Sequence, residues 1–372
     1  MDISFTPNPA PASPQRRAEI LAAPGFGNFF TDHMFASTWS EDDGWHNHRI
    51  VPYGPISMDP ASAVLHYAQE IFEGLKAYRR ADGSIWAFRP EANGARMARS
   101  AARLAIPEYP VDDFVTAIQE LVKVDQSWVD GGSSADSGEA SLYIRPFVFA
   151  SEVFLGVRPA LTYEFMVITS PVGPYFKGGV KPVKIWLSTE YTRAAPGGTG
   201  AAKCGGNYAA SLAPMVEASS HGCEQVCFLD STEQNWVEEL GGMNIYFVHA
   251  DESGQGTLVT PPTSGTILEG VTRGSIMELA KEQGLDVEER RVSIGEWRDG
   301  VATGEISEVF ACGTAAVITP VGELRWDGGS VVTGTGQPGA VTMAIRQSLV
   351  DIQYGRADDT HGWMRQLVSA AE

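Results

Sequence analysis

One lysine between glycine pairs has the setting that most favours covalent chemistry. Lys203 lies in GGTGAAKCGGNYA, residues 197–209. Glycine lets the backbone approach a ligand closely, and an amine in a confined apolar setting loses proton affinity and becomes a nucleophile toward carbonyl groups. A nucleotide-binding phosphate loop needs Gly before the lysine and Ser or Thr after it, whereas Lys203 lies between Ala202 and Cys204. The segment therefore favours either a Schiff-base lysine or a flexible, solvated loop.

Two arginines lie in patterns that suggest anionic ligands. In SLYIRPF, strand alternation places Tyr143 and Arg145 on one face. An arginine in so apolar a strand needs an anionic partner, which is either a bound carboxylate or a structural ion pair. In GARMARSAARLAI, residues 94–106, Arg96 and two further arginines follow one face of an amphipathic helix. Most such arginines face water.

Two further segments could contact an anionic or charged ligand. Val271 and Thr272 precede the helical stretch RGSIMELAKEQG, and the N–H groups at a helix N-terminus bind phosphate readily. In EELGGMN, Glu238 and Glu239 are adjacent carboxylates. A solvated pair is the default interpretation of those carboxylates.

Together with its other motifs, the chain resembles the branched-chain amino acid aminotransferases, which are fold type IV enzymes that use pyridoxal 5'-phosphate (PLP). The resemblance runs from about Gly25 to Gly355. It implies an α/β (α+β) fold of two domains with the cofactor between them. The motifs that carry the resemblance are FTDHM (30–34), GGTGAAKCGGNY (197–208), EELGGMNIYF (238–247), LEGVTR (268–273) and FACGTAAVITP (310–320).

The resemblance assigns cofactor roles to individual residues. It implies that Lys203 forms the Schiff base with PLP and, once displaced by the substrate, moves the proton between the substrate α-carbon and the cofactor. Tyr208 matches the tyrosine that hydrogen-bonds the phenolic oxygen of PLP. Glu239 matches the carboxylate that keeps the pyridine nitrogen protonated, which makes PLP a better electron sink. The residues implied to bind the phosphate are Arg96, Val271, Thr272 and Thr314.

The resemblance also implies a substrate pocket. Tyr143 and Arg145 belong to it, and the arginine would bind the side-chain carboxylate of glutamate or 2-oxoglutarate. Ala315 matches a backbone donor to the substrate carboxylate, and Gly242 stands where some relatives have Thr. Leu155 and Val157 match residues that reach the neighbouring subunit's site, which implies a homodimer. The residues that match the pocket walls are Phe30, Tyr67, Phe72 and Tyr175.

The implied reaction is reversible amino group transfer between L-leucine, L-isoleucine or L-valine and 2-oxoglutarate, giving branched-chain 2-oxo acids and L-glutamate. Two rivals use the same cofactor: D-amino acid aminotransferase and aminodeoxychorismate lyase. A third is an α/β binding protein that has lost catalysis. Oxo acid formation from L-leucine separates the first two from the implied reaction, and replacement of Lys203 tests the third.

The length of the chain predicts the domain organisation that must position these residues. A chain of 372 residues suggests two compact units. The expected divisions are a flexible lead-in over 1–16, a small N-terminal α/β domain over 17–172, a connector over 173–183 and a larger PLP-binding domain over 184–372. Strands are expected over 141–150, 183–191 and 224–230.

The charge and the cysteines limit the partners and the compartment. A formal charge of −19 disfavours nucleic acid and anionic membranes, which bind clustered Lys and Arg. The four cysteines are too few and too irregularly spaced for a secreted disulfide framework, so a cytoplasmic protein is expected. His221, Cys223 and Cys227 lack a convincing fourth ligand for zinc, and no metal is expected.

Overall fold

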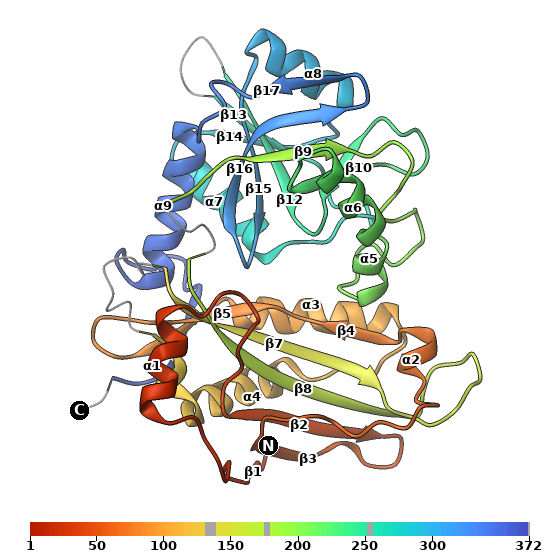
Figure 1. The fold of residues 1–372 in the computed structure, drawn as a ribbon, viewed down its shortest axis with the longest axis vertical. Coiled ribbons are helices and arrows are strands. Elements are labelled where there is room, and N and C mark those ends of the chain that lie inside the picture. The colour runs from red at the N-terminus through yellow and green to blue at the C-terminus, as the bar shows by residue number, and fades with distance from the viewer. Residues whose placement is uncertain (131–138, 175–178, 251–255, 371–372) are drawn as a thin grey trace. The chain divides into compact units, whose positions relative to one another are not determined.

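The chain forms two compact units, drawn in Figure 1. The computed structural model describes residues 1–130, 139–174, 179–250 and 256–370. Unit 1 comprises Met1–Tyr175, Ala202–Gly205 and Ile352–Glu372, and unit 2 comprises Phe176–Ala201 and Gly206–Asp351. In the part of the chain that the structure describes, no helix is long and apolar enough to cross a membrane.

Unit 1 contains a nine-stranded sheet in the order β1-β3-β2-β8-β7-β5-β6-β18, with β4 paired to β7. Strand β7 alternates between buried and half-buried side chains because successive residues of a strand point to opposite faces. The strands are β1 (Ser4–Phe5), β2 (His33–Ser40), β3 (Gly44–Pro52), β4 (Glu70–Phe72), β5 (Leu75–Arg79), β6 (Ile85–Phe88), β7 (Ser141–Ala150), β8 (Thr162–Val172) and β18 (Met364–Val368).

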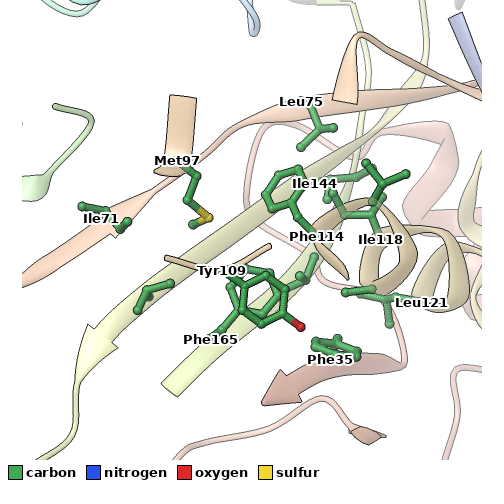
Figure 2. Close-up of a cluster of buried hydrophobic side chains, with 14 of the residues drawn as sticks. Phe35, Ile71, Leu75, Met97, Tyr109, Phe114, Ile118, Leu121, Ile144 and Phe165 are labelled. Carbon is green, nitrogen blue, oxygen red and sulfur yellow. The ribbon is translucent and has the colours of Figure 1, made fainter. Parts of the chain in front are cut away.

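Helices α3 and α4 pack against each other, and α4 also packs on β2 and β8. In α4, apolar residues recur every three to four positions, so that Phe114, Ile118 and Leu121 are buried on one stripe. Figure 2 shows these side chains gathered around Tyr109 and Phe165. The helices of unit 1 are α1 (Pro14–Ala22), α2 (Val64–Tyr67), α3 (Pro90–Arg103), α4 (Val111–Val124) and the 3-10 helix η1 (Gln126–Trp128).

Unit 2 contains a second nine-stranded sheet, in the order β11-β10-β9-β16-β15-β12-β13-β14, with β17 paired to β16. Its strands are β9 (Val183–Leu187), β10 (Gln225–Leu229), β11 (Val237–Leu240), β12 (Asn244–His249), β13 (Thr257–Thr260), β14 (Asp286–Glu289), β15 (Ile306–Gly313), β16 (Val317–Trp326) and β17 (Gly329–Val332). Its helices are α6 (Leu212–Ser220), α7 (Val271–Glu282) and α8 (Ile294–Thr303). Helix α5 (Gly205–Ala209) begins with the last residue of the 202–205 segment of unit 1, and α9 (Ala340–Tyr354) begins in unit 2 and ends in unit 1.

The mixed α/β fold expected from the sequence is confirmed, and so is the strand over 141–150. The strands expected over 183–191 and 224–230 are shorter, because β9 ends at Leu187 and β10 covers Gln225–Leu229. The amphipathic helix of the arginine-rich segment begins earlier than its apolar pattern indicated. It starts at Pro90, where proline is well suited to the first turn of a helix.

The division into units differs from the expected boundaries in three places. Strand β1 pairs with β3, and Ser13 caps α1 by accepting a hydrogen bond from the Arg16 N–H, so the lead-in over 1–16 contains regular structure. The C-terminal strand β18 pairs with β6, which places the end of the chain in unit 1. Segment Ala202–Gly205 also belongs to unit 1. Part of the expected connector, residues 175–178, lies outside the described residues.

We predict that Phe165→Ala lowers the free energy of unfolding by about 3 to 5 kcal/mol, because it leaves a cavity in the core of unit 1. Phe165 is fully buried and its ring stacks on Tyr109 at 3.8 Å. Urea unfolding measures the change. The control is Val216→Ala, whose side chain is 73% exposed and whose loss should change stability by less than about 0.5 kcal/mol. Equal losses in both variants would contradict the assigned core.

Candidate active site

Lys203 is held by its backbone within unit 1. Its N–H donates to Ser100 Oγ at 2.9 Å, and its carbonyl accepts from the Phe72 N–H at 2.9 Å. Two residues further on, the Gly205 N–H donates to the carboxylate of Glu70. The Lys203 Nζ atom lies 4.6 Å from the centroid of the Phe72 ring. The segment is thus fixed and half-buried, and a freely solvated loop does not describe it.

Arg96 forms a buried ion pair with Glu73. The Nε and Nη2 atoms of Arg96 donate to the two carboxylate oxygens of Glu73 at 2.8 and 2.7 Å, and Asn93 Nδ2 donates at 2.8 Å. Burial opposes ionisation of Glu73, but the charge and hydrogen bonds of Arg96 outweigh it, so the pKa of Glu73 lies below its ordinary value. Lys203 acts in the same direction. Arg96 therefore has a fixed orientation, whereas Arg99 on the same helix is exposed.

Arg145 lies beside the same aromatic ring as Lys203. Its Cζ atom is 4.7 Å from the Phe72 centroid, and its Nη2 donates to the Tyr143 hydroxyl at 2.9 Å. The buried Nε of Arg145 has no hydrogen-bond partner among the described residues. A Cβ atom at Gly74 would collide with the Tyr143 hydroxyl, so this position requires glycine. Tyr143, Arg145, Phe72 and Lys203 thus form one connected group.

The remaining pocket residues predicted in unit 1 lie in two places. Phe30 stacks on Tyr53 with ring centroids 4.8 Å apart. Tyr67 is 40% exposed and its hydroxyl donates to the Leu155 carbonyl at 2.5 Å. Leu155 and Val157 are 62% and 87% exposed. The predicted pocket residue Tyr175 lies outside the described residues.

In unit 2, Glu239 is a buried carboxylate on β11. It is 1% exposed, its Oε2 lies 3.1 Å from Arg193 Nε, and its Oε1 accepts the Leu268 N–H. The adjacent guanidinium of Arg193 offsets part of the cost of burying this carboxylate. The neighbouring Glu238 accepts a hydrogen bond from Thr266 Oγ1 at 2.5 Å. Both carboxylates are buried, so the solvated pair considered as the default is wrong.

Tyr208, on helix α5, lies near Gly242. A Cβ atom at Gly242 would lie 3.0 Å from Tyr208 Cε1, so a larger residue would crowd the ring. Asn207 joins the two ends of the segment 199–207. Its Nδ2 donates to the Thr199 carbonyl at 2.8 Å, and its Oδ1 accepts from Thr199 Oγ1 at 2.7 Å. The lysine segment is therefore tied together on both sides of Lys203.

Two backbone features of unit 2 could bind an anion. Helix α7 begins at Val271 and Thr272, and its N-cap residue is Gly270. Its N–H groups and dipole favour a negatively charged ligand. Thr314 and Ala315 lie in the tight turn that joins β15 to β16.

Comparison with known proteins places the chain in a family. The family described as amino-transferase class IV matches residues 70–324. The chain belongs to the class IV amino-transferases. Within this family it belongs with the branched-chain amino acid aminotransferases. It is 54% identical over 367 residues to the branched-chain-amino-acid aminotransferase of Mycolicibacterium smegmatis, covering 99% of this chain and 98% of the relative. It is 56% identical over 357 residues to that of Mycobacterium tuberculosis, covering 96% of each chain.

Solved structures of class IV aminotransferases are similar in fold. The branched-chain amino acid aminotransferase of Escherichia coli matches with a TM-score of 0.72 and 29% identity, over 89% of this chain and 99% of that chain. That of Thermobaculum terrenum in its PLP form matches with a TM-score of 0.72 and 26% identity, over 91% and 99%. The chain is therefore a PLP-dependent transaminase of fold type IV, because the family depends on PLP.

The residues present fit PLP, the cofactor of class IV aminotransferases. Unit 2 offers a buried carboxylate, Glu239, for a protonated ring nitrogen, and the N-terminus of helix α7 for a phosphate. Unit 1 offers a lysine amine beside an apolar ring. In the described residues, no group of three or more His, Cys, Asp and Glu could hold a metal ion. Burial raises the pKa of the Cys227 thiol far above its ordinary range, which makes it a poor metal ligand.

Four residues near the class IV site were missed by sequence reasoning. Glu73 and Arg193 compensate the charges of Arg96 and Glu239, and Ser100 and Glu70 accept from the backbone of the lysine segment. Glu73 carried a signal, because a carboxylate inside the apolar run IFEGL needs a cation, just as Arg145 needs an anion. No comparable pattern marked the other three.

We predict that Glu73→Gln lowers the free energy of unfolding by about 3 to 5 kcal/mol, because it leaves the buried charge of Arg96 without its carboxylate. Glu120→Gln is the matched control, since Glu120 forms an exposed pair with Lys123 at 2.6 Å that is worth less than about 1 kcal/mol. Urea unfolding at neutral pH measures both variants. A small effect in Glu73→Gln would show that the buried pair is not needed for folding.

The second buried carboxylate predicts a pH dependence. Burial raises the pKa of Glu238 above its ordinary value, against the hydrogen bond from Thr266 and the charge of Arg193. The folded chain then binds the Glu238 proton more tightly than the unfolded chain, so stability falls as pH rises through the window between the two pKa values. Glu238→Gln removes this loss and keeps an acceptor for Thr266.

We therefore expect Glu238→Gln to unfold at higher urea concentration than the native chain at pH 7, and at the same concentration below about pH 4. Glu278→Gln, at an exposed position of α7, is the control and should show no such change with pH. A Glu238→Gln variant that is less stable at pH 7 would contradict the argument.

Proposed function

We propose that the chain transfers the amino group reversibly between L-leucine, L-isoleucine or L-valine and 2-oxoglutarate, giving branched-chain 2-oxo acids and L-glutamate. The observation that carries the proposal is the group around Phe72, where an apolar ring lies 4.6 Å from the Lys203 amine and 4.7 Å from the Arg145 guanidinium. One group of residues in unit 1 then presents an amine for chemistry, apolar surface for an aliphatic side chain and a cation for a carboxylate. The names of the relatives from Mycolicibacterium smegmatis and Mycobacterium tuberculosis support the same reaction.

Each unit supplies part of the residue set that would bind PLP. Lys203 would bind it covalently, Tyr208 would hydrogen-bond its phenolic oxygen, and Glu239 would pair with its ring nitrogen. PLP, when bound, supplies an electron sink for the bonds at the substrate α-carbon. The residues proposed to hold its phosphate are Arg96, Val271, Thr272 and Thr314.

Lys203 would also move the proton. Once the substrate amine has displaced it, its Nζ atom would take the proton from the substrate α-carbon and would deliver it to the cofactor. The Lys203 N–H donates to Ser100 Oγ and the Lys203 carbonyl accepts from the Phe72 N–H, so the backbone is held and the amine stays within reach. The Phe72 ring offers an apolar surface whose face also attracts a cation, so it can lie beside the Lys203 amine.

Two kinds of substrate must share this pocket. A branched aliphatic side chain gains about 0.8 kcal/mol for each methylene group that it buries, and Phe72 with Tyr143 provides such surface. The side-chain carboxylate of glutamate would bind Arg145, whose buried Nε lacks a partner among the described residues. The proposed backbone donor to the α-carboxylate is Ala315, and Gly242 is a further proposed substrate-binding residue. Phe30, Tyr67 and Tyr175 are the remaining proposed pocket walls.

We further propose that the protein is a homodimer in the cytoplasm. The exposed side chains of Leu155 and Val157 support a contact with a second subunit, because such a contact would remove their apolar surface from water. The four cysteines are all buried and unpaired, which supports a reducing compartment.

We predict that Lys203→Ala lowers kcat with L-leucine and 2-oxoglutarate by about 10³-fold or more, because the variant lacks both the covalent anchor and the proton carrier. Oxo acid formation from L-leucine, measured with excess PLP, tests this. Lys184→Ala is the control, since its ammonium is exposed and pairs with Glu323 at 3.8 Å. Turnover of D-leucine in place of L-leucine by the native chain would contradict the proposed substrate class.

A further inference from the structure

One edge of strand β4 carries the lysine segment. Its other edge pairs with β7, where Phe72 lies opposite Phe147 and Glu70 opposite Phe149. On the lysine side, the Phe72 N–H donates to the Lys203 carbonyl at 2.9 Å. Strand β4 is only three residues long, so it offers few backbone groups that could hold the segment.

The side chain of Glu70 supplies a second attachment from the same strand. Its carboxylate accepts the Gly205 N–H, two residues beyond Lys203. A Cβ atom at position 205 would collide with this carboxylate, which would then have to move. Glu70 is half-buried, and burial raises its pKa although the Gly205 N–H and Arg145 lower it. A carboxylate kept in such a place at a cost in desolvation indicates a role beyond surface charge.

We propose that Glu70 is a positioning residue that holds Lys203 in place through the Gly205 N–H. Ser100 accepts the Lys203 N–H, and the Phe72 N–H donates to the Lys203 carbonyl. Glu70 adds a third contact by accepting the Gly205 N–H. Loss of the Glu70 contact frees the backbone on the side that leads into α5. The Lys203 amine then samples more positions, and a small misplacement of a reacting group is costly in rate. This inference rests on the proposed function for its catalytic consequence only.

The matched pair Glu70→Ala and Glu70→Gln tests the inference. Alanine removes the acceptor, whereas glutamine removes the charge and keeps a carbonyl oxygen that can accept the Gly205 N–H. Asp82→Ala is the control, because Asp82 also accepts a backbone N–H, that of Ser84 at 2.9 Å, in a turn of unit 1. Circular dichroism and thermal unfolding establish that each variant is folded.

The first readout is amide hydrogen exchange of the peptide that spans residues 199–208 in the full-length protein. A hydrogen bond to a charged acceptor is worth enough that its loss should speed exchange at Gly205 by about tenfold or more. We expect this in Glu70→Ala, and changes below about threefold in Glu70→Gln and Asp82→Ala. Exchange in Glu70→Ala at the native rate overturns the inference, as does equally fast exchange in Glu70→Gln.

The second readout is steady-state kinetics with L-leucine and 2-oxoglutarate. We expect kcat to fall about tenfold in Glu70→Ala with KM for L-leucine changed less than about threefold, and kcat to recover in Glu70→Gln. A rise in KM at constant kcat overturns the positioning role. If the native chain fails to transaminate these substrates, the proposed function is wrong, while the exchange measurement still decides whether Glu70 holds the segment.

Discussion

The backbone of Lys203 is fixed by hydrogen bonds to groups that come from distant parts of unit 1. Ser100 lies on α3 and Phe72 on β4, and both contact Lys203 itself at 2.9 Å. A catalytic amine needs this kind of support, because a side chain on a mobile loop loses orientation with every backbone motion. The fold of unit 1 places β4 and α3 on either side of the Lys203 backbone. Residues 202–205 cluster with unit 1 although the chain on both sides of them belongs to unit 2.

The charges around the site are arranged as compensated pairs. Unit 1 buries Glu73 against Arg96, and unit 2 buries Glu239 against Arg193. An unpaired ion in either place would be strongly destabilising, whereas a hydrogen-bonded pair keeps both charges and holds them in a fixed direction. Fixed charges in a site from which water is excluded are the main means by which enzymes stabilise charge that develops during reaction. The two pairs therefore stabilise their own units and, under the proposed function, would also present fixed charges to the cofactor.

Much of the fold and part of the site could be predicted from the sequence. Alternation in SLYIRPFVFA gave β7, and the family motifs gave Lys203, Arg96 and Glu239 their proposed roles. The short strand β4 could not be predicted, because three residues carry no periodicity. The contacts of Ser100 and Glu70 with the lysine segment join positions more than 100 residues apart, and no local pattern encodes such pairs. The C-terminal strand β18 was assigned to the wrong unit for the same reason, since its partner β6 lies early in the chain.

The absorption spectrum of the purified protein, recorded first alone, then with L-leucine and then with 2-oxoglutarate, tests the central claim most directly. The account predicts a visible band of bound PLP that L-leucine bleaches without any oxo acid present and that 2-oxoglutarate restores. This sequence of changes requires that the amino group be stored on the enzyme between two half-reactions. A band that does not respond to L-leucine, or no band after PLP is added, would contradict the account.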